Sequence, residues 1–238
     1  MKKILLALFV ISISSFAEEP LSLDSVSVRL WQQTCLFPNE KIHLHTDRSL
    51  YVGGDTLWFR AYLVNAINNQ PEKTSRYIYT ELVNPFSKVV NRVKIRQDVD
   101  SLFYGYLPLD TDLPGGEYTI RAYTRYMENG GESFFFRKPI RVVTPFDKAL
   151  KTDLSLERKS AIKQVTGILE MKNRTTGMGI SLENVTVLDE HGEVDYWTKD
   201  KQCHFKVTPS KYKHNVIMLE ASNYQRYFPL SLPQNDYE

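Results

Sequence analysis

Apolar and polar residues alternate along most of the chain from residue 41 onward, the period expected of strands with one buried face. In residues 56–64 the inward positions are Leu57, Phe59, Ala61 and Leu63, and the outward ones are Trp58, Arg60 and Tyr62. The same alternation marks the segments 41–47, 76–83, 89–95, 103–109, 118–126 and 133–143. Turn residues separate these segments, so the pattern predicts an antiparallel β-sandwich of seven strands.

Two segments depart from this alternation. Residues 20–36 predict one short helix, because Val26, Leu30 and Trp31 fall on one stripe behind a capping Asp24 or Ser25. Residues 50–55 contain Gly53 and Gly54. Since glycine adopts positive φ at little cost, we expect a turn there.

Short strands also fill the C-terminal part. Residues 148–163 are polar and are expected to form a connector and a first edge. Six further strand candidates follow, at 165–171, 180–188, 194–198, 203–207, 215–221 and 227–232. The sequence thus predicts an all-β protein of two tandem antiparallel β-sandwich domains. The predicted divisions are an N-terminal segment at 18–39, a first sandwich at 40–147, a connector at 148–163 and a smaller second sandwich at 164–238.

The first 17 residues have the pattern of a signal peptide. Lys2 and Lys3 precede an apolar run from Ile4 to Ile13, and small residues end the segment at Ala17. A run of that length is too short to cross a hydrocarbon core of about 30 Å as a helix. We therefore expect an exported protein of the periplasm or outer membrane, with no membrane-spanning segment once the signal is removed.

The charge composition argues against one class of partner, nucleic acid. Beyond the leader, 28 basic residues balance 28 acidic ones, so binding of nucleic acid through bulk charge is not expected. Hydrophobic residues make up 42% of the chain and aromatic residues 12%, which is enough for packed cores.

Several dispersed motifs carry a family resemblance over residues 40–145. The run EKIHLHTDR at 40–48, with GDT at 54–56 and WFRA at 58–61, resembles the opening of the macroglobulin-like domain of the α2-macroglobulin family. LPGGEYTIRAYT at 113–124 is similar to its closing strand, and Gly53 stands where the family commonly has proline. The resemblance is closest to exported Bacteroidetes proteins associated with TonB-dependent receptors. It implies a seven-stranded sandwich used for contact with other domains or proteins.

Protease trapping does not follow from this resemblance. Large family members need a bait region and a thioester from a Cys-x-Glu-Gln motif, whereas Cys35 and Cys203 stand in other contexts. Export permits a Cys35–Cys203 disulfide, and the alternative is two small buried residues.

The C-terminal part carries a second, shorter resemblance. GIL at 167–169, LENVTV at 182–187, TKDKQCHF at 198–205 and ASNY at 221–224 resemble the transthyretin-like domain of carboxypeptidase regulatory modules. Cys203 replaces a usual glycine there. The resemblance implies a structural or docking module without catalytic residues.

Two groups of residues are candidate sites. His43, His45 and Asp47 share one face of a strand, which suits a metal ion, although solvent-facing polar residues look the same. The family segment implies a structural role for Asp47, accepting backbone N–H groups of the following turn. Outward aromatic residues form a candidate interaction surface, comprising Trp58, Tyr62, Tyr77 and Tyr79. The alternative is that a neighbouring strand or the second domain covers them.

The sequence contains no nucleophile elbow, no recognisable catalytic cysteine and no phosphate-binding loop, so neither an enzyme nor a bound cofactor is expected. Our leading hypothesis is a non-catalytic exported cell-envelope protein that acts by protein contact. It would be an accessory or truncated relative of outer-membrane TonB-dependent uptake proteins. The alternatives are a secreted glycan-binding or ligand-binding module, and a metal-assisted enzyme using His43 and His45.

Overall fold

The computed structural model describes residues 23–36, 39–99, 102–158, 164–182, 184–208, 215–221 and 224–231. The predicted signal peptide and the segment 209–214 therefore lie outside the described residues. The chain divides into two units, Met1–Asn39 and Glu40–Glu238. The first contains helix α2 (Leu23–Leu36) where the sequence predicts one, but Asp24 and Ser25 lie within the helix and do not occupy its N-cap position. Val26, Leu30 and Trp31 on its stripe are exposed. No helix in the described part of the chain is both long and apolar enough to cross a membrane.

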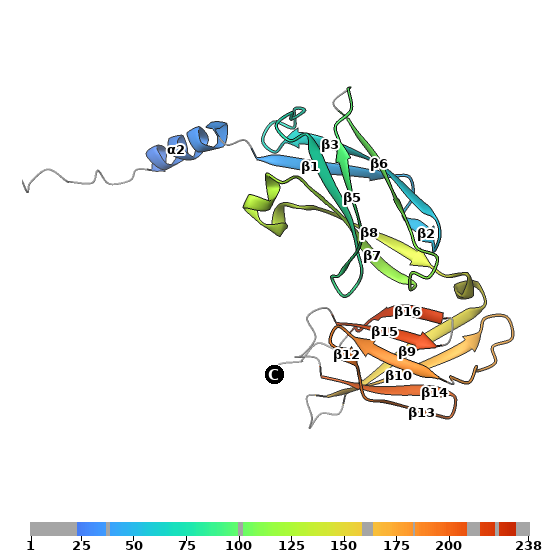
Figure 1. The fold of residues 1–238 in the computed structure, drawn as a ribbon. Helices are drawn as coiled ribbons and strands as arrows, with labels where there is room; N and C mark the ends of the chain where they lie inside the picture. The colour runs from blue at the N-terminus through green and yellow to red at the C-terminus, as the bar shows by residue number, and fades with distance from the viewer. Residues whose placement is uncertain are drawn as a thin grey trace, which may run out of the picture. The chain divides into compact units, whose positions relative to one another are not determined.

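Two facing sheets make up the first sandwich (Figure 1). The three-stranded sheet has the order β1 (Glu40–Thr46), β3 (Thr56–Asn65) and β6 (Phe103–Pro108). The five-stranded sheet has the order β2 (Leu50–Val52), β8 (Phe136–Val143), β7 (Gly116–Tyr123), β4 (Tyr77–Val83) and β5 (Val89–Arg96). The prediction of an all-β sandwich is confirmed for this part of the chain.

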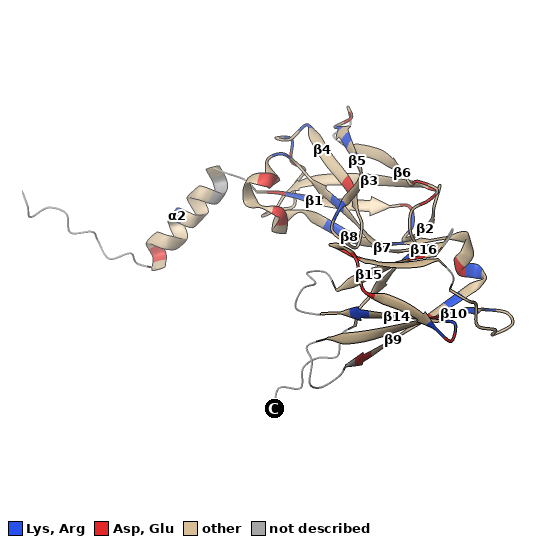
Figure 2. Cartoon of the chain, turned by 60° about the horizontal axis from the view of Figure 1, so that its bottom comes forward, with Lys and Arg blue, Asp and Glu red and all other residues tan. Residues whose placement is uncertain are grey.

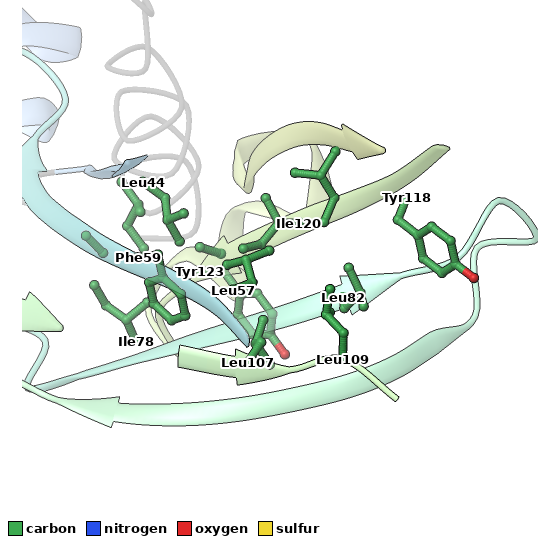
Figure 3. Packing of buried hydrophobic residues seen from close by; sticks show 14 of the residues in the cluster. Leu44, Leu57, Phe59, Ile78, Leu82, Leu107, Leu109, Tyr118, Ile120 and Tyr123 are labelled. Atoms are coloured by element: carbon green, nitrogen blue, oxygen red, sulfur yellow. The ribbon is translucent and has the colours of Figure 1, made fainter. Parts of the chain in front are cut away.

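The core of this sandwich lies between the two sheets, as the alternation predicts. Strand β3 contributes Leu57, Phe59, Ala61 and Leu63, all of them buried. Figure 3 shows how residues of β3 pack with those of the facing sheet, such as Ile78, Leu82 and Ile120. Each fully buried side chain of this size contributes about 1.5–3 kcal/mol, so this cluster holds the two sheets together.

Strand β2 differs from the sequence prediction. Residues 50–55 were expected to form a turn, but Leu50–Val52 pair in parallel with Arg141–Val143 of β8, and Tyr51 is fully buried. The turn itself follows, with Gly54 at φ 89°. A Cβ atom at Gly53 would lie 2.7 Å from the Thr111 carbonyl oxygen, so this position also excludes a side chain.

The connection from β7 to β8 also differs. The strand predicted to reach residue 126 ends at Tyr123, and two short 3-10 turns follow, η1 (Met127–Gly130) and η2 (Glu132–Phe134). Phe135 then stacks on Tyr123, with ring centroids 4.3 Å apart. The connection therefore covers part of the outer face of the five-stranded sheet.

The second sandwich also has two antiparallel sheets. One has the order β13 (Tyr196–Lys199), β14 (Gln202–Val207), β10 (Val165–Asn173) and β9 (Leu150–Arg158). The other has the order β12 (Gly192–Glu193), β11 (Val185–Asp189), β15 (Val216–Ala221) and β16 (Tyr224–Pro229). Strand β9 occupies most of the segment expected to form a connector and a first edge, and it is the edge strand of this sheet, paired along the whole of β10.

Cys203 lies inside this second core. Its thiol is buried and free, and burial raises its pKa to about 11. This agrees with the alternative to a disulfide, in which the cysteine acts as a small buried residue. The Cys35 side chain lies outside the described part of the structure.

Strand β16 joins the two sandwiches. The Tyr227 ring packs edge-on against Phe86 and Tyr118, at centroid distances of 5.0 and 5.9 Å. The Tyr227 N–H donates to the Gly115 carbonyl, and Arg226 forms an ion pair with Asp147. A Cβ atom on Gly116 would lie 2.9 Å from that of Tyr227, so the Gly115-Gly116 pair makes room for β16.

Candidate functional site

The outer face of the three-stranded sheet carries a row of exposed aromatic residues around one arginine. Strand register places Trp58 opposite Tyr106 and Arg60 opposite Tyr104. We refer to Trp58, Arg60, Tyr62, Tyr104 and Tyr106 together as the aromatic face. The exposed fractions of its four aromatic residues are 56% for Trp58, 36% for Tyr62, 48% for Tyr104 and 54% for Tyr106.

Arg60 lies at the centre of this face. Its guanidinium carbon is 5.2 Å from the ring centroids of both Tyr62 and Tyr104. Each such cation–π contact contributes about 0.5–1 kcal/mol at an exposed site. The Arg60 Nε atom is buried and has no hydrogen-bond partner in the described structure. The rings therefore hold this charged group in place without an acidic partner.

Aromatic contacts continue on both sides of Arg60. The rings of Trp58 and Tyr106 are 5.0 Å apart and tilted by 43°. At the other end, the His43 ring lies 6.5 Å from that of Tyr62. Together with His43 on β1, the aromatic face therefore forms a continuous strip of rings across β1, β3 and β6.

The predicted metal ligands do not converge. His43 packs edge-on against Phe136 at 5.6 Å, and His45 pairs across the strands with Arg60. Among the residues that the structure describes, no group of three His, Cys, Asp or Glu side chains is arranged to hold a metal ion.

Asp47 has a structural environment instead. Its Oδ1 atom accepts hydrogen bonds from the Tyr51 hydroxyl at 2.7 Å and from the Trp58 N–H at 3.1 Å. Partial burial opposes its ionisation, but the hydrogen bonds from Tyr51, Arg48 and Trp58 are stronger and lower its pKa. The bonded N–H belongs to β3 and not to the turn that follows β1. Asp47 thus fixes the start of the strand that carries the aromatic face.

Tyr77 and Tyr79 lie on β4, in the other sheet, so the four aromatic residues predicted as one surface do not share a face. Tyr77 is exposed, with the Lys94 Nζ atom 4.2 Å from its ring centroid. Tyr79 is half-buried and stacks on Tyr123 at 5.5 Å. For Tyr79 the alternative prediction, that a neighbouring strand covers the side chain, describes the structure better than an open binding surface.

The outer face of the five-stranded sheet also holds a buried carboxylate. Glu81 is fully buried and accepts hydrogen bonds from Arg92 Nε at 2.6 Å, Arg121 Nε at 2.8 Å and the Tyr123 hydroxyl at 2.9 Å. Burial opposes ionisation of Glu81, but these bonds outweigh it and lower its pKa. The pKa of Tyr123 rises to about 12 because of burial and its bond to Glu81. Glu132 extends the cluster by pairing with Arg121 and Arg137.

Sequence reasoning missed Tyr104, Tyr106 and Glu81 as site residues. The two tyrosines could have been found, because they occupy the outward positions of the strand predicted at 103–109. Glu81 could not, since alternation also places it outward and does not show that Arg92, Arg121 and Tyr123 gather around its carboxylate. Figure 2 shows that Lys and Arg and also Asp and Glu occur in both sandwiches, as the balanced composition predicts.

A cavity of about 610 Å³ lies where β16 meets the first sandwich. Its lining includes Ile140, Val216 and Tyr227. The Tyr227 hydroxyl accepts a hydrogen bond from the Asn84 amide, so the polar group is already satisfied. This cavity is therefore part of the interface between the two sandwiches.

Residues 41–137 match the family model of the MG2 domain, and this part of the chain is a macroglobulin-like domain. A search of curated proteins found no significant match.

Solved structures similar to the chain include two bacterial α2-macroglobulins and an adhesin. Salmonella α2-macroglobulin reacted with methylamine has a TM-score of 0.38 and 13% identity, over 80% of this chain and 15% of that one. Trypsin-activated α2-macroglobulin from Escherichia coli has a TM-score of 0.37 and 12% identity, over 81% and 16%. The Yersinia pseudotuberculosis adhesin InvE has a TM-score of 0.33 and 12% identity, over 79% and 58%. The chain thus spans about a sixth of these macroglobulins.

Proposed function

We propose that this chain is a non-catalytic contact protein and that its macroglobulin-like domain binds a protein partner through the aromatic face. One observation carries the proposal. Trp, Tyr and Arg, the residue types that dominate binding energy at protein interfaces, lie side by side on one sheet face with their aromatic rings exposed.

The geometry of the face favours contact through side chains. The backbone of β3, at its centre, is paired on both edges with β1 and β6. A partner therefore meets a flat surface of rings that are already ordered by their neighbours. Ordered aromatic side chains lose little conformational entropy on binding, which favours them as anchors.

The place of action proposed is the cell envelope. The signal-like leader and the resemblance to exported Bacteroidetes proteins support the periplasm or the outer membrane. The partner in this proposal is an outer-membrane protein of a TonB-dependent uptake system. The transthyretin-like resemblance of the C-terminal part supports a second docking module in the same chain.

Site-specific photo-crosslinking in the native envelope tests the proposal. A photoreactive amino acid is placed at Tyr106 or Tyr62 of the full chain, and at Tyr77 on the other sheet as a control. We expect the same envelope protein to be crosslinked from Tyr106 and Tyr62 and not from Tyr77. Absence of any crosslink from the aromatic face, with the protein folded and exported, would overturn the proposal.

Glycan binding is the second candidate, because the Trp58–Tyr106 pair could stack on a sugar ring. The outer positions of the three strands offer few partners for sugar hydroxyls, since they carry no Asn, Gln, Asp or Glu. These positions are Lys41, His43, His45, Thr56, Trp58, Arg60, Tyr62, Val64, Tyr104, Tyr106 and Pro108. Binding on a glycan array that disappears in Trp58→Ala would favour this candidate over a protein partner.

A further inference from the structure

We infer that the protein partner carries an acidic side chain that pairs with Arg60 between the rings of Tyr62 and Tyr104. This inference rests on the proposed function and names the chemistry of the partner. It follows from a charge that the domain holds in place and leaves without a counter-charge.

Arg60 differs from the eight other arginines of its sandwich. Five of them form ion pairs with a carboxylate of the same domain, namely Arg48, Arg92, Arg121, Arg125 and Arg137. The other three, Arg76, Arg96 and Arg141, are exposed to solvent, whereas Arg60 is half-buried. Arg60 has no ion pair in the described part of the chain, although its Nε atom is buried. Because the Nε atom is buried, a carboxylate of the partner would pair with the terminal N–H groups of the guanidinium.

The tyrosine rings also fix the direction of the guanidinium group. Contact with two rings restricts Arg60 to a narrow set of rotamers. A guanidinium presents a planar fork of N–H donors that fits a carboxylate with two parallel hydrogen bonds. Because the group is already oriented, less entropy is lost when the pair forms.

The charge around Arg60 selects an acidic partner. Lys41, His43 and His45 occupy the outward positions of β1 beside it. Asp47 and Asp55, which precede β3, both pair with Arg48, at 3.1 and 3.2 Å. The face thus offers positive charge and donors without a competing carboxylate, and complementarity favours a partner of negative potential.

Other polyanions fit less well. Nucleic acid binds through many phosphate contacts, whereas Lys41 and Arg60 are the only Lys and Arg on the outward positions of the three strands. The carboxylates of an acidic polysaccharide could pair with Arg60, but the face offers few hydrogen-bond acceptors for the sugar hydroxyls. A protein surface with one acidic side chain among apolar residues matches the whole face.

Titration with defined probes, followed by NMR, tests this inference on the full mature chain. The probes are a ten-residue peptide of alternating Glu and Tyr, the same peptide with Gln, a galacturonate hexamer and a ten-nucleotide oligothymidine. The readouts are the indole N–H signal of Trp58, assigned by its loss in Trp58→Phe, and the Arg60 amide signal. We expect the Glu peptide to shift both signals at a concentration at least tenfold lower than the Gln peptide.

Matched variants locate the effect. Arg60→Gln should abolish the difference between the Glu and Gln peptides, whereas Arg96→Gln, which removes an exposed arginine from the other sheet, should leave it unchanged. Equal binding of the two peptides would overturn the inference. So would tighter binding of the galacturonate or the oligonucleotide, since these would assign the face to a glycan or a nucleic acid.

Crosslinking from Tyr106 separates this inference from the proposed function. If Arg60→Gln removes the crosslink while the variant keeps the unfolding temperature of wild type, the proposed function and the acidic partner are both supported. If the crosslink persists in Arg60→Gln, the docking face stands and the acidic partner is refuted. If the wild-type protein gives no crosslink, the proposed function itself fails.

Discussion

The two outer faces of the first sandwich contain the same residue types, but one is buried around its own carboxylate and the other is exposed without one. On the five-stranded sheet, Arg92, Arg121 and Tyr123 converge on Glu81, which is fully buried. On the three-stranded sheet, Arg60 lies between two tyrosines with no acid beside it. We refer to them as the closed face and the aromatic face.

The difference lies in the counter-charge and in the cover. The closed face contains its own carboxylate, and the connection after β7 places Phe135 over Tyr123. The aromatic face has neither, and its rings remain exposed. A set of arginines and tyrosines therefore stabilises the fold where the chain supplies the acid, and is available for binding where it does not.

Replacing Glu81 should produce the largest change. Glu81→Ala removes the fully buried carboxylate and leaves Arg121 paired only with the exposed Glu132, and removing one partner of a buried pair costs about 3–5 kcal/mol. Urea unfolding of the variant checks this value. Glu117→Ala on the same sheet, where the side chain is exposed, is the control and should unfold like wild type. A loss below about 1 kcal/mol in Glu81→Ala would contradict the view of a closed structural face.

Acid should weaken the closed face first. The pKa of Glu81 is lowered in the folded protein from the usual 4.5, so its contribution is complete above that value and is lost as pH falls toward the folded pKa. We therefore expect the free energy of unfolding to fall below about pH 4.5 by more in wild type than in Glu81→Gln.

Unfolding both proteins in urea between pH 6 and pH 3 measures this difference. The pKa values of Asp47 and Glu72 are also lowered, but both groups are present in both proteins. The difference between the two curves thus reports Glu81 alone, and parallel curves would contradict the prediction.

Removing one hydroxyl from each face gives a smaller and sharper comparison. Tyr123→Phe loses a hydrogen bond to the Glu81 carboxylate, which should cost about 1.5–3 kcal/mol. Tyr104→Phe keeps the ring under Arg60 and should change stability by less than about 0.5 kcal/mol. Thermal and urea unfolding check both, and equal effects would remove the distinction between the faces.

A small effect on stability is also expected for Trp58 on the aromatic face. Trp58 is 56% exposed, so Trp58→Ala should change the free energy of unfolding by less than about 1 kcal/mol. The same change should remove most crosslinking from Tyr106 to the partner. If Trp58→Ala unfolds the domain, the residue is part of the fold and the face is not free for binding.

Local periodicity determined most of the fold. Strands β1 and β3 bury the residues that alternation assigns to the core, because one buried face imposes a period of two on any strand. The outward positions of Trp58 and Tyr62 followed from the same rule, as those of Tyr104 and Tyr106 could have done. The motif match over residues 40–145 placed the macroglobulin-like domain, which the family comparison supports at 41–137.

Only the tertiary structure decided which outward residues share a face and which are covered. Trp58 and Tyr79 have the same local pattern, yet they lie on different sheets because strand order depends on pairing between distant segments. Glu81 and Arg60 likewise occupy equivalent outward positions. Glu81 is fully buried among Arg92, Arg121 and Tyr123, whereas Arg60 is half-buried among exposed rings. Alternation fixes the side of the strand that a residue occupies, whereas burial of that side depends on long-range packing that the local pattern does not encode.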